Sequence, residues 1–199
     1  MKYLAQLKAA LFLAALFPLL RLAGLAYFSL LGANPIEFIT RSLGTWTLVL
    51  LLVTLSITPL RHLSGWSWLI RLRRMAGLFA FFYALLHFIT YIWLDQFFDL
   101  SSIYKDVIKR PFITIGFAAF VLLLPLAITS TNAMRKKLGR RWQMLHRLIY
   151  PIAILAVLHY WLLVKQDVTQ PLIYAAVLCV LLVYRVWRYS LNRGFMKKS

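Results

Sequence analysis

The sequence has little of what covers the surface of a soluble enzyme. Only 14% of its 199 residues are charged and only five are acidic, whereas a soluble domain has about 25% charged residues. The single cysteine, Cys179, excludes an internal disulfide and a zinc site or cluster built on several thiolates. No G-x-G-x-x-G or P-loop motif follows a strand-like segment, so the usual sites for nicotinamide cofactors and nucleoside triphosphates are missing. A conventional cytosolic enzyme is therefore excluded.

Hydrophobic residues make up 62% of the chain, and they are concentrated in long runs. A membrane-spanning helix needs about 20 mostly apolar residues. Six stretches meet this requirement, at approximately 9–31, 42–60, 75–94, 112–128, 146–164 and 168–187. The sequence therefore predicts an all-α, polytopic membrane protein in which residues 1–199 form one transmembrane domain, a bundle of six helices.

The two signs of charge are distributed unevenly between the connections. Most of the 23 Lys and Arg residues lie before the first run, after the second, after the fourth and after the sixth. All five acidic residues lie in the other three connections: Glu37, Asp95, Asp99, Asp106 and Asp167. Because Lys and Arg accumulate in cytoplasmic loops, we expect both termini to be cytoplasmic. The positive charges interrupt apolar runs and do not cover a polar surface, so we expect a lipid bilayer and no nucleic acid as the partner.

Histidines inside apolar runs are the first candidates for chemistry, because ionisable groups are costly in a bilayer. His87 lies in the third run and His159 in the fifth, each within about two helical turns of the acidic end. Two neutral imidazoles that face each other across a bundle can hold a haem iron. The alternative is two separate histidines, each hydrogen-bonded to a polar neighbour, and spacing does not decide between them. His62, beside Arg61, is interpreted as a solvated loop residue.

A second, weaker site is suggested at the basic end of the bundle. His146 lies roughly 20 Å along the helix from His159, on a different face of an ideal helix. Arg73 lies on nearly the same face as His87 and at the depth of His146. His146 is thus a possible ligand of a second haem, and Arg73 a possible contact for a haem propionate. The alternative is that both side chains anchor their helices at the lipid headgroups.

Arg21 is the charge midway through the first run, and it has two interpretations as well. Its guanidinium either contacts a haem propionate or extends along the helix to the membrane surface. The sequence contains no C-x-x-C-H motif, so a haem here would be bound without a covalent link, as haem b.

Several longer stretches, taken together, resemble one family. They are Ser56–Leu60 (SITPL), Arg73–Leu78 (RRMAGL), Leu86–Tyr91 (LHFITY), Lys109–Phe112 (KRPF) and Thr129–His146 (TSTNAMRKKLGRRWQMLH). With these stretches, and over about residues 10–188, the sequence resembles the MsrQ (YedZ) family of haem-binding membrane subunits. That family belongs to the ferric-reductase-like proteins with six helices. Many of those relatives have two histidines on the third helix and two on the fifth, whereas this sequence has Arg73 where the inner histidine of the third helix is expected.

The resemblance implies an electron-transfer subunit in the bacterial inner membrane, whose catalytic partner is a separate protein. It implies one or two haems b, with His87 and His159 as the ligands of the outer one, and FMN at a site that no residue here identifies. Electrons would come from a cytoplasmic flavin reductase or from membrane quinol. They would pass to MsrP, a periplasmic molybdenum-containing subunit that reduces methionine sulfoxide in oxidised envelope proteins.

Two other functions compete with this one. The first is a haem b reductase of the same superfamily that has no dedicated periplasmic enzyme. The second is a transporter or membrane anchor without redox chemistry, which predicts a colourless protein. If a periplasmic partner exists, the acidic connections with Asp95–Asp106 and Asp167 are the expected docking surface.

Overall fold

The structure of the chain is a computed structural model that describes residues 2–164 and 166–196. Within these ranges every regular element is helical, and six helices are long and apolar enough to cross a membrane. Lys165, Lys197 and Lys198, which contribute to the expected charge distribution, lie outside the described residues. The expected all-α architecture with six membrane-spanning helices is confirmed.

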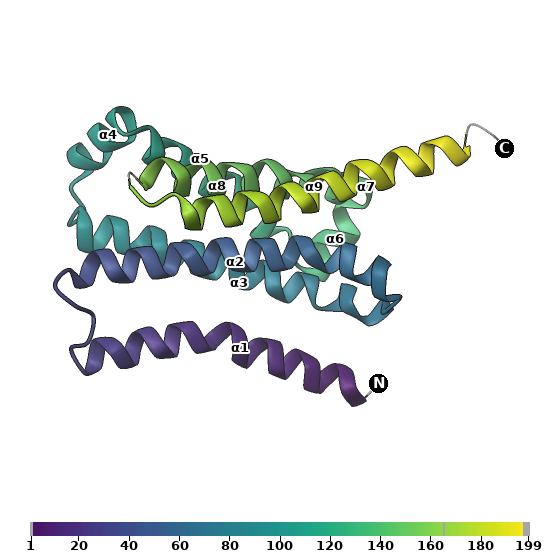
Figure 1. Ribbon diagram of the computed structural model, residues 1–199, viewed down its shortest axis with the longest axis horizontal. Helices are drawn as coiled ribbons and strands as arrows, with labels where there is room; N and C mark the ends of the chain where they lie inside the picture. The colour runs from purple at the N-terminus through teal and green to yellow at the C-terminus, as the bar shows by residue number, and fades with distance from the viewer. Residues whose placement is uncertain (1, 165, 197–199) are drawn as a thin grey trace.

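The elements follow one another as α1 (Lys2–Tyr27), α2 (Pro35–Ser64), a 3-10 turn η1 (Ser67–Arg71), α3 (Arg73–Thr90), a π-helical turn η2 (Tyr91–Asp95), α4 (Leu100–Lys109), α5 (Pro111–Ile128), α6 (Asn132–Leu138), α7 (Arg140–Leu145), a 3-10 turn η3 (His146–Leu148), α8 (Ile149–Leu163) and α9 (Thr169–Met196). The long helices lie side by side along one axis (Figure 1). α1 begins and α9 ends at the same end of the bundle, and α4 lies at the opposite end (Figure 1).

The bundle is built around two helix pairs. α2 packs chiefly on α3, and α5 packs chiefly on α8. Small residues lie at the closest contacts, since Ala80 of α3 and Ala153 of α8 have no exposed surface, as expected where helices approach closely in a membrane. Leu51, Tyr83 and Ile152 are the largest hydrophobic side chains buried almost completely between these helices. The two pairs therefore form the core, and both candidate histidines lie on it.

Large apolar side chains also cover the outside of the bundle. Phe17 is 62% exposed and Val180 is 68% exposed, and many other large hydrophobic side chains are similarly uncovered. A soluble protein rarely leaves such an extended apolar surface uncovered. The surface is that of a protein whose helices face lipid.

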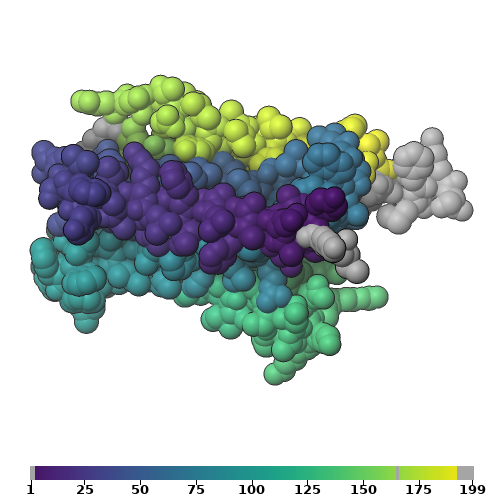
Figure 2. Space-filling view, turned by 90° about the horizontal axis from the view of Figure 1, so that it is seen from below, coloured from purple at the N-terminus to yellow at the C-terminus, as the bar shows by residue number. Residues whose placement is uncertain are grey.

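A hydroxyl group of α3 links α1 to the core, beside the apolar contacts of Ala15 and Leu22. α1 runs along the outside of the bundle for most of its length (Figure 2). The Tyr83 hydroxyl donates to the Ala15 carbonyl at 2.7 Å and accepts from the Leu19 amide at 3.2 Å. These are the two groups that an uninterrupted helix would pair with each other, and Pro18 lies between them. The Tyr83 hydroxyl thus lies between the Ala15 carbonyl and the Leu19 amide of α1, next to Pro18.

Two segments differ from the expectation. The connection Asp95–Pro111 was expected as a loop, yet it contains α4, a ten-residue helix that is too short to span a bilayer. Asp99 begins this helix, because its carboxylate accepts from the Ser101 amide and the Ser102 hydroxyl at 2.9 and 2.8 Å. The fifth run begins with the 3-10 turn η3 and continues as α8, and the short helix α7 directly precedes it. Pro151 follows the turn η3, and proline has no amide hydrogen with which to continue the helical ladder.

Candidate functional site

A cavity of about 560 Å³ lies between the two helix pairs, within the range of about 300–1,000 Å³ that is typical of cofactor sites. Its inner wall is apolar and includes Leu51, Leu123 and Ile152. Towards the end of the bundle that carries α4, the lining becomes polar and includes Glu37, Arg41, Tyr91, Asp95 and Arg110. His87 and His159 both line the cavity.

The structure brings the two membrane-embedded histidines together across the cavity. His87 comes from α3 and His159 from α8, and their ring centroids lie 6.1 Å apart with an angle of 76° between the ring planes. The residues that share the cavity wall with them are largely apolar, including Phe88, Phe117 and Phe120. The expectation of similar depth and facing side chains therefore agrees with the observed geometry.

One ring nitrogen of each histidine is hydrogen-bonded to the backbone. His87 Nδ1 lies 2.8 Å from the Thr40 carbonyl oxygen, and His159 Nδ1 lies 2.6 Å from the Phe112 carbonyl oxygen. A carbonyl oxygen only accepts, so Nδ1 carries the hydrogen and donates it in both cases. In the neutral ring Nε2 is then an unprotonated nitrogen with a free lone pair. Histidine ligands of metals are held in this way, with the other ring nitrogen donating to a backbone carbonyl.

The polar mouth of the cavity contains charged pairs and two unpaired hydroxyls. Arg41 contacts Glu37 at 2.5 Å, and Arg110 contacts Asp106 at 3.3 Å. The hydroxyl oxygens of Thr40 and Tyr91 are buried and have no hydrogen-bond partner among the described residues. Two guanidinium groups and two free hydroxyls thus lie around the same opening.

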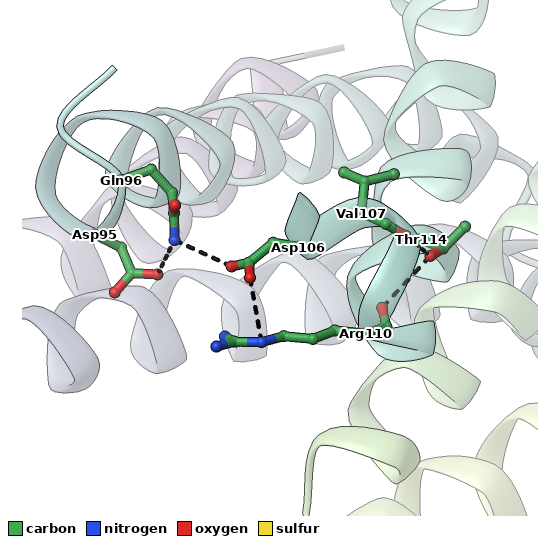
Figure 3. Close-up of polar contacts among 6 residues, drawn as sticks. All are labelled: Asp95, Gln96, Asp106, Val107, Arg110 and Thr114. Carbon is green, nitrogen blue, oxygen red and sulfur yellow. Dashed lines mark hydrogen bonds and ion pairs between the residues drawn. The ribbon is translucent and has the colours of Figure 1, made fainter. Parts of the chain in front are cut away.

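The segment after α3 is joined to α4 and α5 by a polar network (Figure 3). The Gln96 side-chain amide donates to Asp95 at 3.3 Å and to Asp106 at 3.1 Å, and Asp106 in turn pairs with Arg110. The Thr114 hydroxyl donates to the carbonyl oxygens of Val107 and Arg110 (Figure 3).

The acidic side chains at this end have local structural roles. The Ser102 hydroxyl and the Ser101 amide donate to the Asp99 carboxylate and lower its pKa. Hydrogen bonds from Thr169 lower the pKa of Asp167 in the same way, and its carboxylate accepts from the Thr169 amide at 2.9 Å, at the start of α9. These residues hold turns and helix starts, so they are not simply free surface charges.

The other predicted residues lie outside the cavity lining. His146 Nε2 lies 3.1 Å from the Thr129 hydroxyl, and its ring stacks on Trp142 with centroids 3.9 Å apart. Arg73 begins α3 at the same end of the bundle as His146, near enough for its charge to act on the imidazole. Arg21 lies exposed on α1, and His62 lies exposed near the end of α2.

Sequence reasoning missed the polar groups at the mouth, namely Thr40, Arg41, Tyr91 and Arg110. Arg41 and Arg110 lie just before the second and fourth apolar runs, so neither is an ionisable group inside a run, and Arg110 enters only as part of the Lys109–Phe112 stretch. The available signal was that each arginine follows an acidic residue by one helical turn, at Glu37 and Asp106. That spacing places each guanidinium beside a carboxylate, but it does not show that both face one cavity.

The donor set has a clear chemical limit. No group of three or more His, Cys, Asp or Glu side chains in the described parts of the chain could hold a metal ion. A bare zinc ion takes three or four protein ligands, which this cavity does not offer. Two opposed imidazoles are instead suited to a metal that already carries an equatorial set of ligands, as haem iron does.

Comparison with known proteins identifies the family. The model of the family "Ferric reductase like transmembrane component" matches residues 42–157. A protein from Herminiimonas arsenicoxydans is 62% identical over 92% of this chain and 86% of its own length. Relatives from Ralstonia nicotianae and Azospira oryzae are 57% and 54% identical over 94% and 100% of this chain, and over 87% and 86% of their own lengths. All three are named protein-methionine-sulfoxide reductase heme-binding subunit MsrQ.

The chain belongs to the MsrQ family. The resemblance inferred from the sequence stretches is thereby confirmed, and so is the ferric-reductase-like superfamily. As a member of the MsrQ family the chain is a multi-pass membrane protein, in agreement with its six apolar helices. The matched region begins in α2 and ends in α8, so it spans the two helix pairs that enclose the cavity.

Proposed function

We propose that this chain is the haem-binding subunit of a methionine sulfoxide reductase and that His87 and His159 are the axial ligands of a haem b. The observation that carries the proposal is the shared arrangement of the two imidazoles. Each donates Nδ1–H to a backbone carbonyl and leaves Nε2 free to bind a metal in a mostly apolar cavity. The names of the relatives, each a heme-binding subunit, support the same cofactor.

The cavity fits this group in its polarity as well. A haem has an apolar ring and two carboxylates, and the cavity has an apolar inner wall and a mouth with Arg41 and Arg110. The buried Thr40 hydroxyl, which has no hydrogen-bond partner among the described residues, is free to donate to such a carboxylate. We therefore propose Arg41 and Arg110 for the propionate contacts of this haem, since Arg21 does not line the cavity; Arg73 stays a candidate contact at the inner site.

The residues of the chain have distinct roles at this site. The Nδ1–H bonds fix the orientation of both rings and make Nε2 more basic. The surrounding Phe88 and Phe120, which stack with centroids 4.5 Å apart, contribute to an apolar environment that limits access of water. A haem held here supplies a one-electron redox centre. The protein itself supplies the ligands, the burial and the nearby charge.

The charge distribution supports an orientation of the chain in the membrane, and the resemblance supplies the direction of electron flow. The basic connections lie at the end of the bundle with the termini, and α4 with its acidic neighbours lies at the other. We infer that the basic end is cytoplasmic, that the membrane is the bacterial inner membrane, and that His87 and His159 lie nearer the periplasm. Electrons then arrive from a cytoplasmic flavin reductase or from quinol and leave towards MsrP.

A second haem at the cytoplasmic end is the weaker part of the proposal, and FMN is proposed from the resemblance alone, without a site. Arg73 and His146 both lie at that end, but His146 Nε2 contacts the Thr129 hydroxyl, so this nitrogen would have to exchange that contact for iron. The His87 and His159 site requires no such exchange. We therefore propose one haem at the cavity and treat the inner site as the weaker candidate.

The acidic end is proposed as the docking surface for MsrP, with one refinement from the structure. Asp95 and Asp106 share the Gln96 amide, and Asp99 caps α4. Charge reversal at these positions would therefore disturb the fold as well as the surface. Glu37 is held in a similar way, because it pairs with Arg41 and accepts from the Asn34 side-chain amide at the start of α2.

Reoxidation of the haem in membranes tests the function. The haem is first reduced through a quinol or a flavin reductase, and purified MsrP and methionine sulfoxide are then added together or separately. We expect rapid reoxidation only when both are present. Reoxidation at an unchanged rate without MsrP would contradict the proposed partnership and favour a ferric-reductase-like enzyme that acts alone.

A further inference from the structure

Two glycines lie directly against the two candidate ligands. A Cβ atom added to Gly44 of α2 would lie 3.1 Å from His87 Cε1 and 3.2 Å from His87 Nδ1. A Cβ atom added to Gly116 of α5 would lie 2.7 Å from His159 Nδ1 and 2.8 Å from its Cε1. Each imidazole thus occupies space that any other residue at the glycine would fill.

The glycines are placed in the same way relative to the hydrogen bonds. Gly44 lies one helical turn after Thr40, and Gly116 lies one turn after Phe112, the two residues whose carbonyls accept from Nδ1. In both cases 47 residues separate the histidine from the residue that provides the carbonyl. The two helix pairs therefore repeat one arrangement, in which the imidazole crosses over a glycine to reach the backbone of the preceding turn.

We propose that Gly44 and Gly116 are positioning residues that hold the two imidazoles in the orientation and tautomer needed for metal binding. The inference rests on the proposed haem site. It extends that site from the helices that carry the histidines, α3 and α8, to the helices that pack on them, α2 and α5. Without a Cβ, the helix presents its backbone to the ring, and the carbonyl of the preceding turn becomes accessible to Nδ1–H. Hydrogen bonds of this kind to a histidine ligand commonly change metal affinity by about 10–100-fold.

Simple helix packing does not account for both glycines. Gly77, in α3 with His87, provides the comparison, because a Cβ there would meet Thr54 Cγ2 at 3.6 Å, an ordinary contact. Gly24 of α1 has nothing within 4 Å of its added Cβ. Of these four glycines, only Gly44 and Gly116 lie against an imidazole.

The test compares Gly44→Ala and Gly116→Ala with Gly77→Ala in the full-length protein. Haem per chain, the visible spectrum and the midpoint potential are measured on detergent-solubilised protein that elutes as a single species. We expect Gly116→Ala to weaken haem binding by about 10–100-fold, Gly44→Ala to retain more haem but to shift the potential, and Gly77→Ala to resemble the wild type. If Gly116→Ala does not fold, Gly44→Ala decides, because its contact is the milder of the two.

A measurement on the haem-free protein separates this inference from the proposed function. Nitrogen-15 shifts of the histidine side chains report which ring nitrogen is protonated. We expect Nδ1–H in the wild type and in Gly77→Ala, and a shift towards Nε2–H in Gly44→Ala and Gly116→Ala. Unchanged tautomers, haem content and potential in both variants would overturn the positioning role even if the wild type binds haem. A wild type that binds no haem but shows the expected tautomers would overturn only the proposed cofactor.

Discussion

At the scale of single residues, the two nitrogens of each cavity histidine have separate tasks. Nδ1 of His87 and of His159 is committed to a backbone carbonyl, and Nε2 is left for a ligand bond. The sequence predicts both histidines and their similar depth from apolar runs alone. It does not predict the tautomer, because the accepting carbonyls belong to Thr40 and Phe112, on other helices. Every residue has a backbone carbonyl, so the sequence does not show which of them accepts.

The guanidinium groups at the cavity mouth give a prediction at the same scale. Reduction adds a negative charge to a haem, so a nearby cation favours the reduced state. Replacing Arg41 or Arg110 by Gln should lower the midpoint potential by on the order of 30 mV, about half the ~59 mV that accompanies a tenfold change for one electron. Redox titration of each variant measures this shift.

Arg61→Gln is the matched control for these variants, because Arg61 is exposed at the opposite end of α2. Its potential should equal that of the wild type. A potential that is unchanged in both Arg41→Gln and Arg110→Gln would contradict the placement of the haem carboxylates at the mouth.

At the scale of helices, the six apolar spans can be predicted from the sequence, whereas the short helix α4 cannot. The sequence predicts the six apolar helices because a span of about 20 apolar residues has few other stable states. It misses α4 because that helix is short and amphipathic: Leu100, Tyr104 and Ile108 are exposed, while Ile103 and Val107 line the cavity. The apolar side of α4 is half-buried only because the helix lies across the cavity mouth, and that position depends on the rest of the bundle.

The attachment of α1 through Tyr83 leads to a stability prediction. Tyr83→Phe removes the hydroxyl that serves both the Leu19 amide and the Ala15 carbonyl. Leaving such groups unpaired costs about 1–3 kcal/mol, so the unfolding temperature in detergent should fall. Tyr104→Phe is the control, because Tyr104 is 69% exposed on α4. Equal unfolding temperatures for the two variants would contradict the proposed attachment.

At the scale of the whole molecule, the two helix pairs enclose one cavity that opens towards α4. The apolar runs and the uneven charge predict the number of spans and their relative direction, since each depends on a property summed over many residues. The shape of the cavity depends instead on single contacts such as the close approach of His159 to Gly116. A glycine in an apolar run gives no indication of which side chain lies against it.

The orientation of the molecule in the membrane can be tested with thiol labelling. In a Cys179→Ala background, Lys105→Cys places an exposed thiol on α4, and His62→Cys places one near the basic end of α2. A membrane-impermeant reagent added to intact spheroplasts should label Lys105→Cys only, because α4 is expected to face the periplasm. Labelling of His62→Cys in place of Lys105→Cys would reverse the proposed direction of electron transfer.

The most direct test of the haem site is the amount of haem per purified chain, with the reduced-minus-oxidised spectrum, in His87→Ala, His159→Ala and His62→Ala. The wild type and His62→Ala should show a b-type, bis-histidine spectrum with the same haem content, because His62 is exposed away from the cavity. His87→Ala and His159→Ala should each lose the haem of the cavity. Full haem content with an unchanged spectrum in either of these two variants would contradict the assignment of the axial ligands.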